Sequence, residues 1–108
     1  MQKYNENAIG LAISSILVLS QGIDVYNQMH SGLGVTDIVA ITKDTIYIME
    51  LKLDLDDARV ALEQIKEKDY SSIYVNNPLY KKKLVVMMGL SFRSKDASLI
   101  DCKTELKS

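Results

Sequence analysis

The sequence predicts a small α/β domain in which helices pack on a mixed β-sheet. Its 108 residues suit one domain, and no internal repeat or proline-rich linker divides them, so we expect residues 1–108 to fold as a unit. Apolar residues make up 47% and charged residues 25%, the balance of a globular protein. Hydrophobic residues recur first at helical and then at strand spacing along the chain. The predicted order is helix, three strands, helix and strand, with a candidate fifth strand at the end.

The first predicted element is an apolar helix over residues 5–20. Its apolar residues at helical spacing are Ile9, Ala12, Ile13, Ile16 and Leu17. We expect so apolar a helix to be mostly buried against a sheet, with Gly22 at its end. The apolar run 8–19, about twelve residues, is shorter than the roughly 20 that a membrane span needs. Glu6 lies where a cleaved signal peptide would be basic, so we interpret the run as a helix of the fold.

Three strands are predicted after this helix. Residues 23–29 alternate weakly, residues 36–42 are dense in β-branched side chains, and residues 45–53 give the clearest strand pattern. Residues 31–34 form a turn, and Lys43-Asp44 is a tight connection between the second and third strands. We therefore expect the second and third strands to form a hairpin.

A second helix is predicted over residues 57–68, after the third strand. Residues 54–57 supply candidate N-caps and negative charge for its start. Its apolar stripe consists of Ala58, Ala61, Leu62 and Ile65. A loop over residues 69–81 holds the only proline, residues 83–92 read as a buried strand, and residues 98–104 as an edge strand.

Composition excludes several functional classes. The net charge is -1, so no global positive field would attract nucleic acid or an anionic membrane, and such a partner would need a local patch. Cys102 is the only cysteine and His30 the only histidine, which excludes an internal disulfide and a structural Cys/His zinc site. No nucleophile motif accompanies His30, which argues against a Ser-His or Cys-His hydrolase. The lone cysteine favours a reducing, cytoplasmic location.

The predicted third strand carries two charged residues inside an apolar pattern. Glu50 and Lys52 share one face of this strand, while the opposite face is apolar. If Lys43-Asp44 is a two-residue hairpin loop, Asp37 lies directly opposite Glu50. Two facing carboxylates repel each other, so near a partly buried site we expect a cation between them or a raised pKa for one of them.

Asp37, Glu50 and Lys52 together form a set suited to phosphoryl transfer. Carboxylates bind a hard divalent ion such as Mg²⁺. Such an ion polarises a phosphodiester and lowers the pKa of a bound water. Lys52 is suited to orient this water or to stabilise the developing charge. The expected reaction is therefore metal-assisted hydrolysis of a phosphodiester.

This pattern resembles the PD-(D/E)XK nuclease superfamily, in particular the branch of nuclease domains often found after an ATPase-like region in bacterial proteins. The resemblance covers roughly residues 34–92 and consists of several blocks in the same order. The blocks are Gly34-Val35-Thr36-Asp37, Tyr47-Ile48-Met49-Glu50-Leu51-Lys52, Ala61-Leu62-Glu63-Gln64-Ile65-Lys66-Glu67-Lys68-Asp69-Tyr70, Lys82-Lys83 and Gly89-Leu90-Ser91-Phe92. The resemblance implies a restriction-endonuclease-like αβββαβ core with a mixed central sheet flanked by helices.

The resemblance also implies roles for the matching residues. Asp37 and Glu50 would bind Mg²⁺ or Mn²⁺ together with the backbone carbonyl of Leu51, and Lys52 would be the catalytic lysine. Gln64 would complete the catalytic set by positioning water or substrate. Further candidates are Glu6 as a metal ligand from the first helix, and Lys66 and Tyr70 as substrate contacts. Apart from the resemblance, the basic run Lys81, Lys82 and Lys83 is a candidate phosphate-steering patch.

Three function classes stay open. The first is an endo- or exonuclease acting on DNA, although the residues do not exclude RNA. The second is an inactive nuclease-fold module that binds nucleic acid or a protein partner. Relatives carry an arginine beside the Gly-x-x-Asp turn where this chain has Leu33 and Val35, which favours this second class. The third is a structural subunit that forms a homodimer through its apolar surface. The intact Asp37, Glu50 and Lys52 favour the nuclease.

Overall fold

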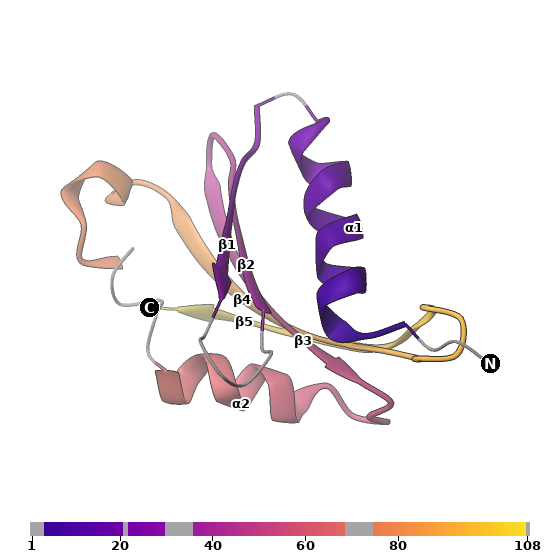
Figure 1. Cartoon of the computed structure of the whole chain (residues 1–108). Helices are drawn as coiled ribbons and strands as arrows, with labels where there is room; N and C mark the ends of the chain where they lie inside the picture. The colour runs from indigo at the N-terminus through magenta and orange to yellow at the C-terminus, as the bar shows by residue number, and fades with distance from the viewer. Residues whose placement is uncertain (1–3, 21, 30–35, 69–74, 108) are drawn as a thin grey trace.

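The computed structural model describes residues 4–20, 22–29, 36–68 and 75–107 (Figure 1). Its elements are α1 (Glu6–Val18), β1 (Asp24–Met29), β2 (Thr36–Ile41), β3 (Thr45–Leu53), α2 (Arg59–Lys68), the 3₁₀ turn η1 (Pro78–Tyr80), β4 (Leu84–Phe92) and β5 (Leu99–Lys107). The predicted order is confirmed, and the fifth strand runs on to Lys107. The predicted loop before β4 contains η1, because the Asn77 side chain accepts a hydrogen bond from the Leu79 N–H at 2.9 Å and caps this turn.

The strands form one sheet in the order β1-β2-β3-β4-β5. Neighbouring strands are antiparallel except β3 and β4, which are parallel because α2 lies in the connection between them. The two helices cover opposite faces of the sheet (Figure 1). α1 packs on β1, β2 and β3, whereas α2 packs on β3, β4 and β5. We refer to these two sides of the sheet as the α1 face and the α2 face.

Strand alternation divides the core into two clusters. The buried cluster on the α2 face consists of Val39, Ile41, Ile46, Ile48, Leu62, Ile65, Val85 and Met87. The buried cluster on the α1 face consists of Ile9, Ile38, Ala40, Met49, Leu51 and Leu90. Burial of each large aliphatic side chain contributes about 1.5–3 kcal/mol, so both clusters stabilise the sheet and hold their helix against it.

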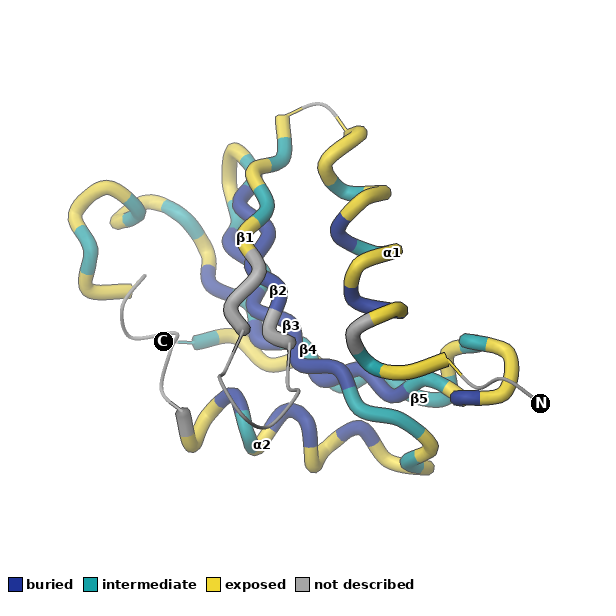
Figure 2. Tube along the Cα trace, in the orientation of Figure 1, coloured by how far each residue is buried: buried dark blue, intermediate teal, exposed yellow. Residues whose placement is uncertain are grey.

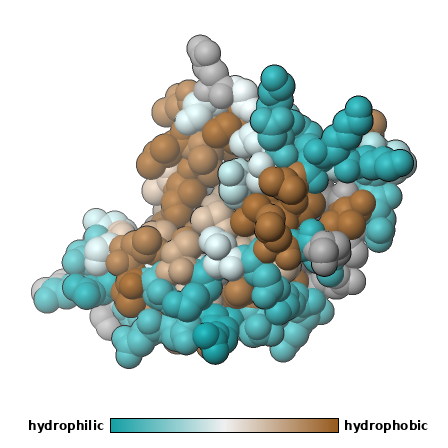
Figure 3. All heavy atoms as spheres, turned by 180° about the vertical axis from the view of Figure 1, so that it is seen from behind, coloured by the Kyte–Doolittle hydropathy of each residue, from teal (hydrophilic) through white to brown (hydrophobic). Residues whose placement is uncertain are grey.

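α1 begins at a capped end and buries one side. The Asn5 side chain accepts a hydrogen bond from the Ala8 N–H at 2.7 Å, which satisfies one of the free donors at the helix start. Ile9 is buried, and Ile13 and Leu17 pack beside it. The other side of α1 is exposed, so the expectation of a mostly buried helix holds on one side only (Figure 2). Apolar side chains gather accordingly at the surface in the view from behind (Figure 3).

α2 lies very close to the sheet at Gly89 of β4. A Cβ atom at this position would lie 2.5 Å from the Ala58 carbonyl oxygen and 2.6 Å from the Leu62 backbone nitrogen. Glycine therefore allows a contact that any other residue would prevent. The helix begins at Arg59 and not at the predicted Asp57, because the Asp57 side chain accepts a hydrogen bond from the Arg59 N–H at 2.8 Å. In the described part of the chain, neither helix is long and apolar enough to cross a bilayer.

Candidate functional site

Asp37 and Glu50 are direct partners across β2 and β3. The hairpin has the predicted tight turn, in which the Thr42 N–H donates to the Thr45 carbonyl at 2.8 Å. Hydrogen-bonded and non-hydrogen-bonded pairs alternate along an antiparallel ladder. Counting from Thr42 and Thr45 makes Asp37–Glu50 a non-hydrogen-bonded pair, whose Cα atoms are typically about 4.5 Å apart. The predicted register is confirmed, and it gives the two positions the closest spacing that a sheet offers.

Glu50 occupies the interior of the α2 face. Its side chain is 0% exposed, and on the other side of β3 its partner is Gly89 of β4. A buried carboxylate is costly unless a cation or hydrogen-bond donors compensate for its lost hydration. Lys52 is half-buried and follows Glu50 on the same face by strand alternation. The backbone register therefore assembles the positions of Asp37, Glu50 and Lys52 on one side of the sheet.

The carbonyl of Leu51 lies at the end of the pairing between β2 and β3. The backbone groups of Thr45 point toward β2, so those of Leu51 do as well, since alternate residues of a strand address the same neighbour. The ladder between β2 and β3 ends at the Asp37–Glu50 pair. The Leu51 carbonyl is therefore directed to the end of β2 at which Asp37 stands, just beyond the last pair.

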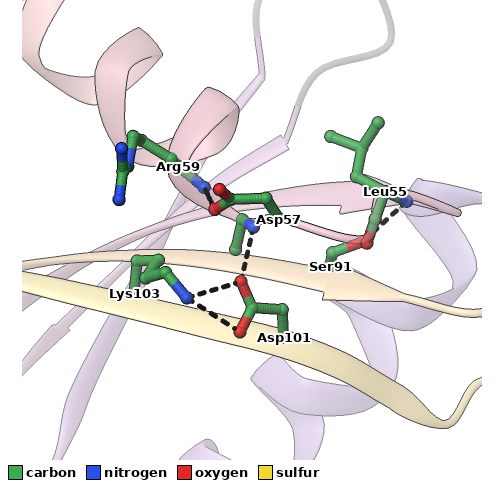
Figure 4. Close-up of polar contacts among 7 residues, drawn as sticks. Leu55, Asp57, Arg59, Ser91, Asp101 and Lys103 are labelled. Carbon is green, nitrogen blue, oxygen red and sulfur yellow. Dashed lines mark hydrogen bonds and ion pairs between the residues drawn. The ribbon is translucent and has the colours of Figure 1, made fainter.

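The start of α2 is held by two polar contacts from β4 and β5 (Figure 4). Asp101 accepts a hydrogen bond from the Ala58 N–H at 2.7 Å and pairs with the Lys103 ammonium at 3.0 Å. The Ala58 hydrogen bond and then Lys103 hold the pKa of Asp101 below its usual value. The buried Ser91 hydroxyl donates to the Leu55 carbonyl at 2.8 Å and accepts from the Leu55 N–H at 3.0 Å. Sequence analysis missed both contacts because they join residues far apart in the chain.

α2 presents Gln64 and Lys66 on opposite flanks. The Lys66 ammonium lies 3.0 Å from a Glu105 carboxylate oxygen of β5, so its flank faces β5. Successive residues turn by about 100°, which puts Gln64 on the flank away from β5, over the side of β3. A pocket of about 430 Å³ runs along α2, lined by Asp57, Arg59, Val60, Glu63, Gln64 and Glu67. Of the two predicted α2 residues, Gln64 lines this pocket, and Lys66 is tied to β5 by its ion pair with Glu105.

Glu6 lies in the layer opposite to Glu50. It belongs to the first turn of α1, whose start is tied to the turn after β4 by the Tyr4 N–H, which donates to the Ser94 carbonyl at 2.8 Å. Because β3 and β4 are parallel, this is also the end of the sheet at which β3 finishes. Glu6 thus approaches the C-terminal end of β3 from the α1 face, and Glu50 lies on the α2 face. Several predicted or compared positions lie outside the described residues: His30, the predicted turn over residues 31–34 with Leu33 and Gly34, Val35, and residues 69–74 with Asp69 and Tyr70.

The basic run 81–83 lies at the opposite end of β3 from Glu50. The Lys83 ammonium donates to the Thr42 carbonyl and, at 2.7 Å, to the Lys43 carbonyl. These carbonyls belong to the β2–β3 turn, and Glu50 lies about 17 Å further along at 3.3 Å per residue. Lys83 therefore fastens the hairpin turn, while Lys81 and Lys82 are exposed.

The oxygen donors at the end of β3 suit a hard divalent cation. Two carboxylates and a backbone carbonyl match the preference of Mg²⁺, which fills its remaining positions with water. Among the side chains that the structure describes, no three of His, Cys, Asp or Glu converge on one metal position. Asp37 is described by its backbone alone, so its contribution rests on its register with Glu50.

Comparison with known proteins agrees with this geometry. A family model for the PD-(D/E)XK nuclease superfamily matches residues 4–101, a stretch that includes both helices and the paired positions of β2 and β3. No match was found among the curated proteins or among the solved structures. The mixed five-stranded sheet with two helices is consistent with the predicted restriction-endonuclease-like fold. The chain therefore belongs to the PD-(D/E)XK nuclease superfamily.

Proposed function

We propose that this chain is a metal-dependent nuclease that hydrolyses phosphodiester bonds, with DNA as its substrate. The observation that carries the proposal is the direct pairing of Asp37 with Glu50 at the end of the β2–β3 ladder. Lys52 follows on the same face, and superfamily membership supports nuclease chemistry. The proposal thus assigns the nuclease activity of the superfamily to Asp37, Glu50 and Lys52, whose positions lie on one face of the sheet.

Asp37, Glu50 and the Leu51 carbonyl are the proposed ligands of Mg²⁺ or Mn²⁺. The bound ion would supply a water of lowered pKa and would polarise the phosphodiester. Glu50 would contribute a carboxylate held in a fixed position, because its side chain is fully buried within a packed strand. In such a site of low dielectric, the attraction between a carboxylate and a cation is stronger than in water.

Lys52 and Gln64 are the proposed groups that act on substrate and water. Lys52 is half-buried. The packing around it would hold the aliphatic part of the side chain in place and leave the ammonium group able to reach a bound phosphate. It would donate a hydrogen bond to the attacking water or to a phosphate oxygen on which charge develops. Gln64 would orient the substrate from the flank of α2, whose start is fixed by Asp101. Lys66 is placed among the contacts that attach α2 to β5.

Lys81 and Lys82 are proposed to attract phosphates at a distance from the chemistry. Both are exposed, and they lie at the end of β3 remote from Glu50. A local positive patch increases the encounter rate with a polyanion even where the net charge is near zero. Glu6 is kept as a candidate ligand from the α1 side, and Tyr70 as a substrate contact.

A cleavage assay with matched variants tests the proposal. The substrates are plasmid, linear duplex, single-stranded and branched DNA, and RNA, each with Mg²⁺ or Mn²⁺. We expect cleavage that requires the metal and falls at least about 100-fold in Glu50→Gln and in Lys52→Met. Lys95→Met, which changes an exposed lysine in the turn after β4, is the matched control and should cleave normally. Cleavage that survives in both site variants would contradict the assignment of the site.

Metal binding separates the nuclease from the binding module. Titration with Mn²⁺, followed by its electron paramagnetic resonance signal, should show binding by the wild type and by Lys52→Met but not by Glu50→Gln. A protein that binds nucleic acid, does not bind Mn²⁺ and cleaves no substrate would support the second class, an inactive nuclease fold. Cleavage of RNA alone would keep the mechanism and replace DNA as substrate.

A further inference from the structure

The outer side of α1 is apolar and uncovered. Glu6 is the only charged residue of this helix. We define the outer α1 surface by Leu11, Ile16, Val18 and the C-cap residue Leu19, which are exposed to 65%, 66%, 63% and 85%. A helix that is apolar on every side is normally buried on every side. The sheet of this chain covers one side of α1, so the outer side is expected to pack on a further surface.

A second, partly uncovered surface without charged residues lies on the α1 face of β4 and β5, where Val86 and Met88 are half-buried and Thr104 and Leu106 are exposed. α1 packs on β1, β2 and β3, and α2 covers β4 and β5 from the other face. We define the open half-sheet by Val86 and Met88 of β4 and their direct partners Leu106 and Thr104 of β5. Leu106 is 62% exposed. By strand alternation, the charged residues of β5 that point to the other face are Asp101, Lys103, Glu105 and Lys107.

The two apolar surfaces occur on the same side of the molecule. In the view from behind, brown apolar side chains gather over the part where α1 lies and again in the middle of the face, whereas the lower edge is polar and teal (Figure 3). Two strands spaced about 4.8 Å apart present a strip about 10 Å wide, which matches the diameter of one helix. Each copy thus carries one helix, α1, with an exposed apolar side, and one surface, the open half-sheet, that is wide enough to pack against a helix.

We propose that two copies of this chain form a twofold-symmetric dimer in which α1 of each copy packs on the open half-sheet of the other. A twofold axis that runs between the two surfaces places the outer α1 surface of one copy on the open half-sheet of the other. The same contact is then repeated with the copies exchanged, because a symmetric interface repeats every contact. α1 then lies between two sheets and is buried on both sides. This arrangement accounts for a largely apolar helix whose only charged residue is Glu6.

The contact area comes close to the lower limit of specific interfaces. α1 has 13 residues and is therefore about 20 Å long and about 10 Å wide, a footprint of about 200 Å². The dimer contains two such footprints, each covering surface on both copies, so about 800 Å² is removed from water before any contact between the two helices is added. Specific interfaces start near 1,200 Å², which the added helix–helix contact approaches.

The charge of the two surfaces favours a second copy over a membrane or a nucleic acid. Peripheral membrane helices and nucleic-acid sites both rely on Lys and Arg side chains around their contact. α1 contains neither residue type, and the four residues of the open half-sheet are uncharged. Because the outer α1 surface and the open half-sheet are both uncharged and both occur on one chain, a second copy of this chain offers each of them a matching surface.

Sedimentation velocity of the full chain, under reducing conditions, tests the dimer without any nuclease assay. We expect the wild type to be dimeric at about 50 µM, and Leu11→Glu and Leu106→Lys each to be monomeric. Both residues are exposed in the single chain, so circular dichroism should show folded variants. Leu79→Glu, which changes an 82% exposed residue of η1, is the matched control and should remain dimeric.

Mixing the two variants gives the decisive result. A Leu11→Glu chain with a Leu106→Lys chain places Glu on one helix against Lys on the facing half-sheet, and leaves the other helix–sheet contact unchanged. We expect this mixture to form a heterodimer although neither variant dimerises alone. A monomeric wild type at this concentration, a dimer indifferent to both changes, or a mixture that stays monomeric would overturn the proposal. If Leu106→Lys is unfolded, Val86→Lys replaces it in the same design.

Discussion

The carboxylate of Asp101, on the edge strand β5, accepts a hydrogen bond at 2.7 Å from the backbone N–H of Ala58, just before α2. This bond satisfies one of the free N–H groups at the helix start, which a residue before the helix normally does. It also fixes the helix relative to the strands. The hydrogen bond from Ala58 to Asp101 of β5 therefore helps to fix the position of α2 and, with it, the flank that carries Gln64.

The charge of Asp101 should stabilise the fold in a pH-dependent way. Its pKa is lowered from 3.8 in the folded chain, so the contribution is full above about pH 4 and is lost as the pH falls through the folded pKa. Asp101→Asn keeps an oxygen for the Ala58 N–H but removes the charge. We expect a lower Tm than the wild type at pH 7 and a smaller difference at pH 3, measured by circular dichroism. Asp24→Asn at an exposed strand end is the control; an equal deficit at both pH values would contradict the charge effect.

Gly89→Ala should displace α2. The added Cβ would meet two backbone atoms, of Ala58 and Leu62, which have no flexible side chain to move aside. Overpacking of a core costs about 1–3 kcal/mol, and we expect a loss of about 3 kcal/mol in the free energy of unfolding, measured in urea. Gly22→Ala is the matched control, since Gly22 has φ +79° and open space around it, and should cost about 1–2 kcal/mol from backbone strain alone. Equal losses for the two variants would contradict the close approach.

Mg²⁺ or Mn²⁺ should raise the Tm of the wild type, because a ligand that binds the folded state alone stabilises it. At 100 times the dissociation constant the gain is about 2.7 kcal/mol. Glu50→Gln should show no such gain, since the amide keeps the shape of the fully buried side chain and loses its charge. Differential scanning fluorimetry with and without metal measures both. A metal-dependent gain that persists in Glu50→Gln would place the ion elsewhere.

Lys83→Met should weaken the hairpin and leave nucleic-acid binding unchanged. The Lys83 ammonium donates to the carbonyls of Thr42 and Lys43, and hydrogen bonds from a charged donor contribute about 1.5–3 kcal/mol. We expect a Tm lower by several degrees. Lys82→Met, at an exposed neighbour, should keep the Tm and flatten the salt dependence of DNA binding instead. If DNA binding by Lys83→Met depended less on salt than binding by the wild type, Lys83 would be a phosphate contact and this prediction would be wrong.

The pairing of β2 with β3 was predictable from the sequence because it depends on local rules. The length of the Lys43-Asp44 turn and the period of two in β3 together determine that Asp37 faces Glu50, and the structure has this register. The helix over Arg59–Lys68 was predicted from its apolar stripe, with its start displaced because Asp57 accepts a hydrogen bond from Arg59. The C-terminal strand was predicted too short, because its last residues, which include the exposed Leu106, lie at the sheet edge and bury no side chain in the core.

The sequence by itself determined the order of the elements and the hairpin register, and it named the candidate residues for the chemistry, since each depends on spacing within a few residues. Only the tertiary structure decided where α2 rests, because the glycine, serine and aspartate that seat it are Gly89, Ser91 and Asp101, on strands remote in sequence. It also decided which flank Gln64 and Lys66 occupy, and which side of α1 stays uncovered. Those outcomes depend on which strands each helix spans, a property of packing across the sheet that no local pattern encodes.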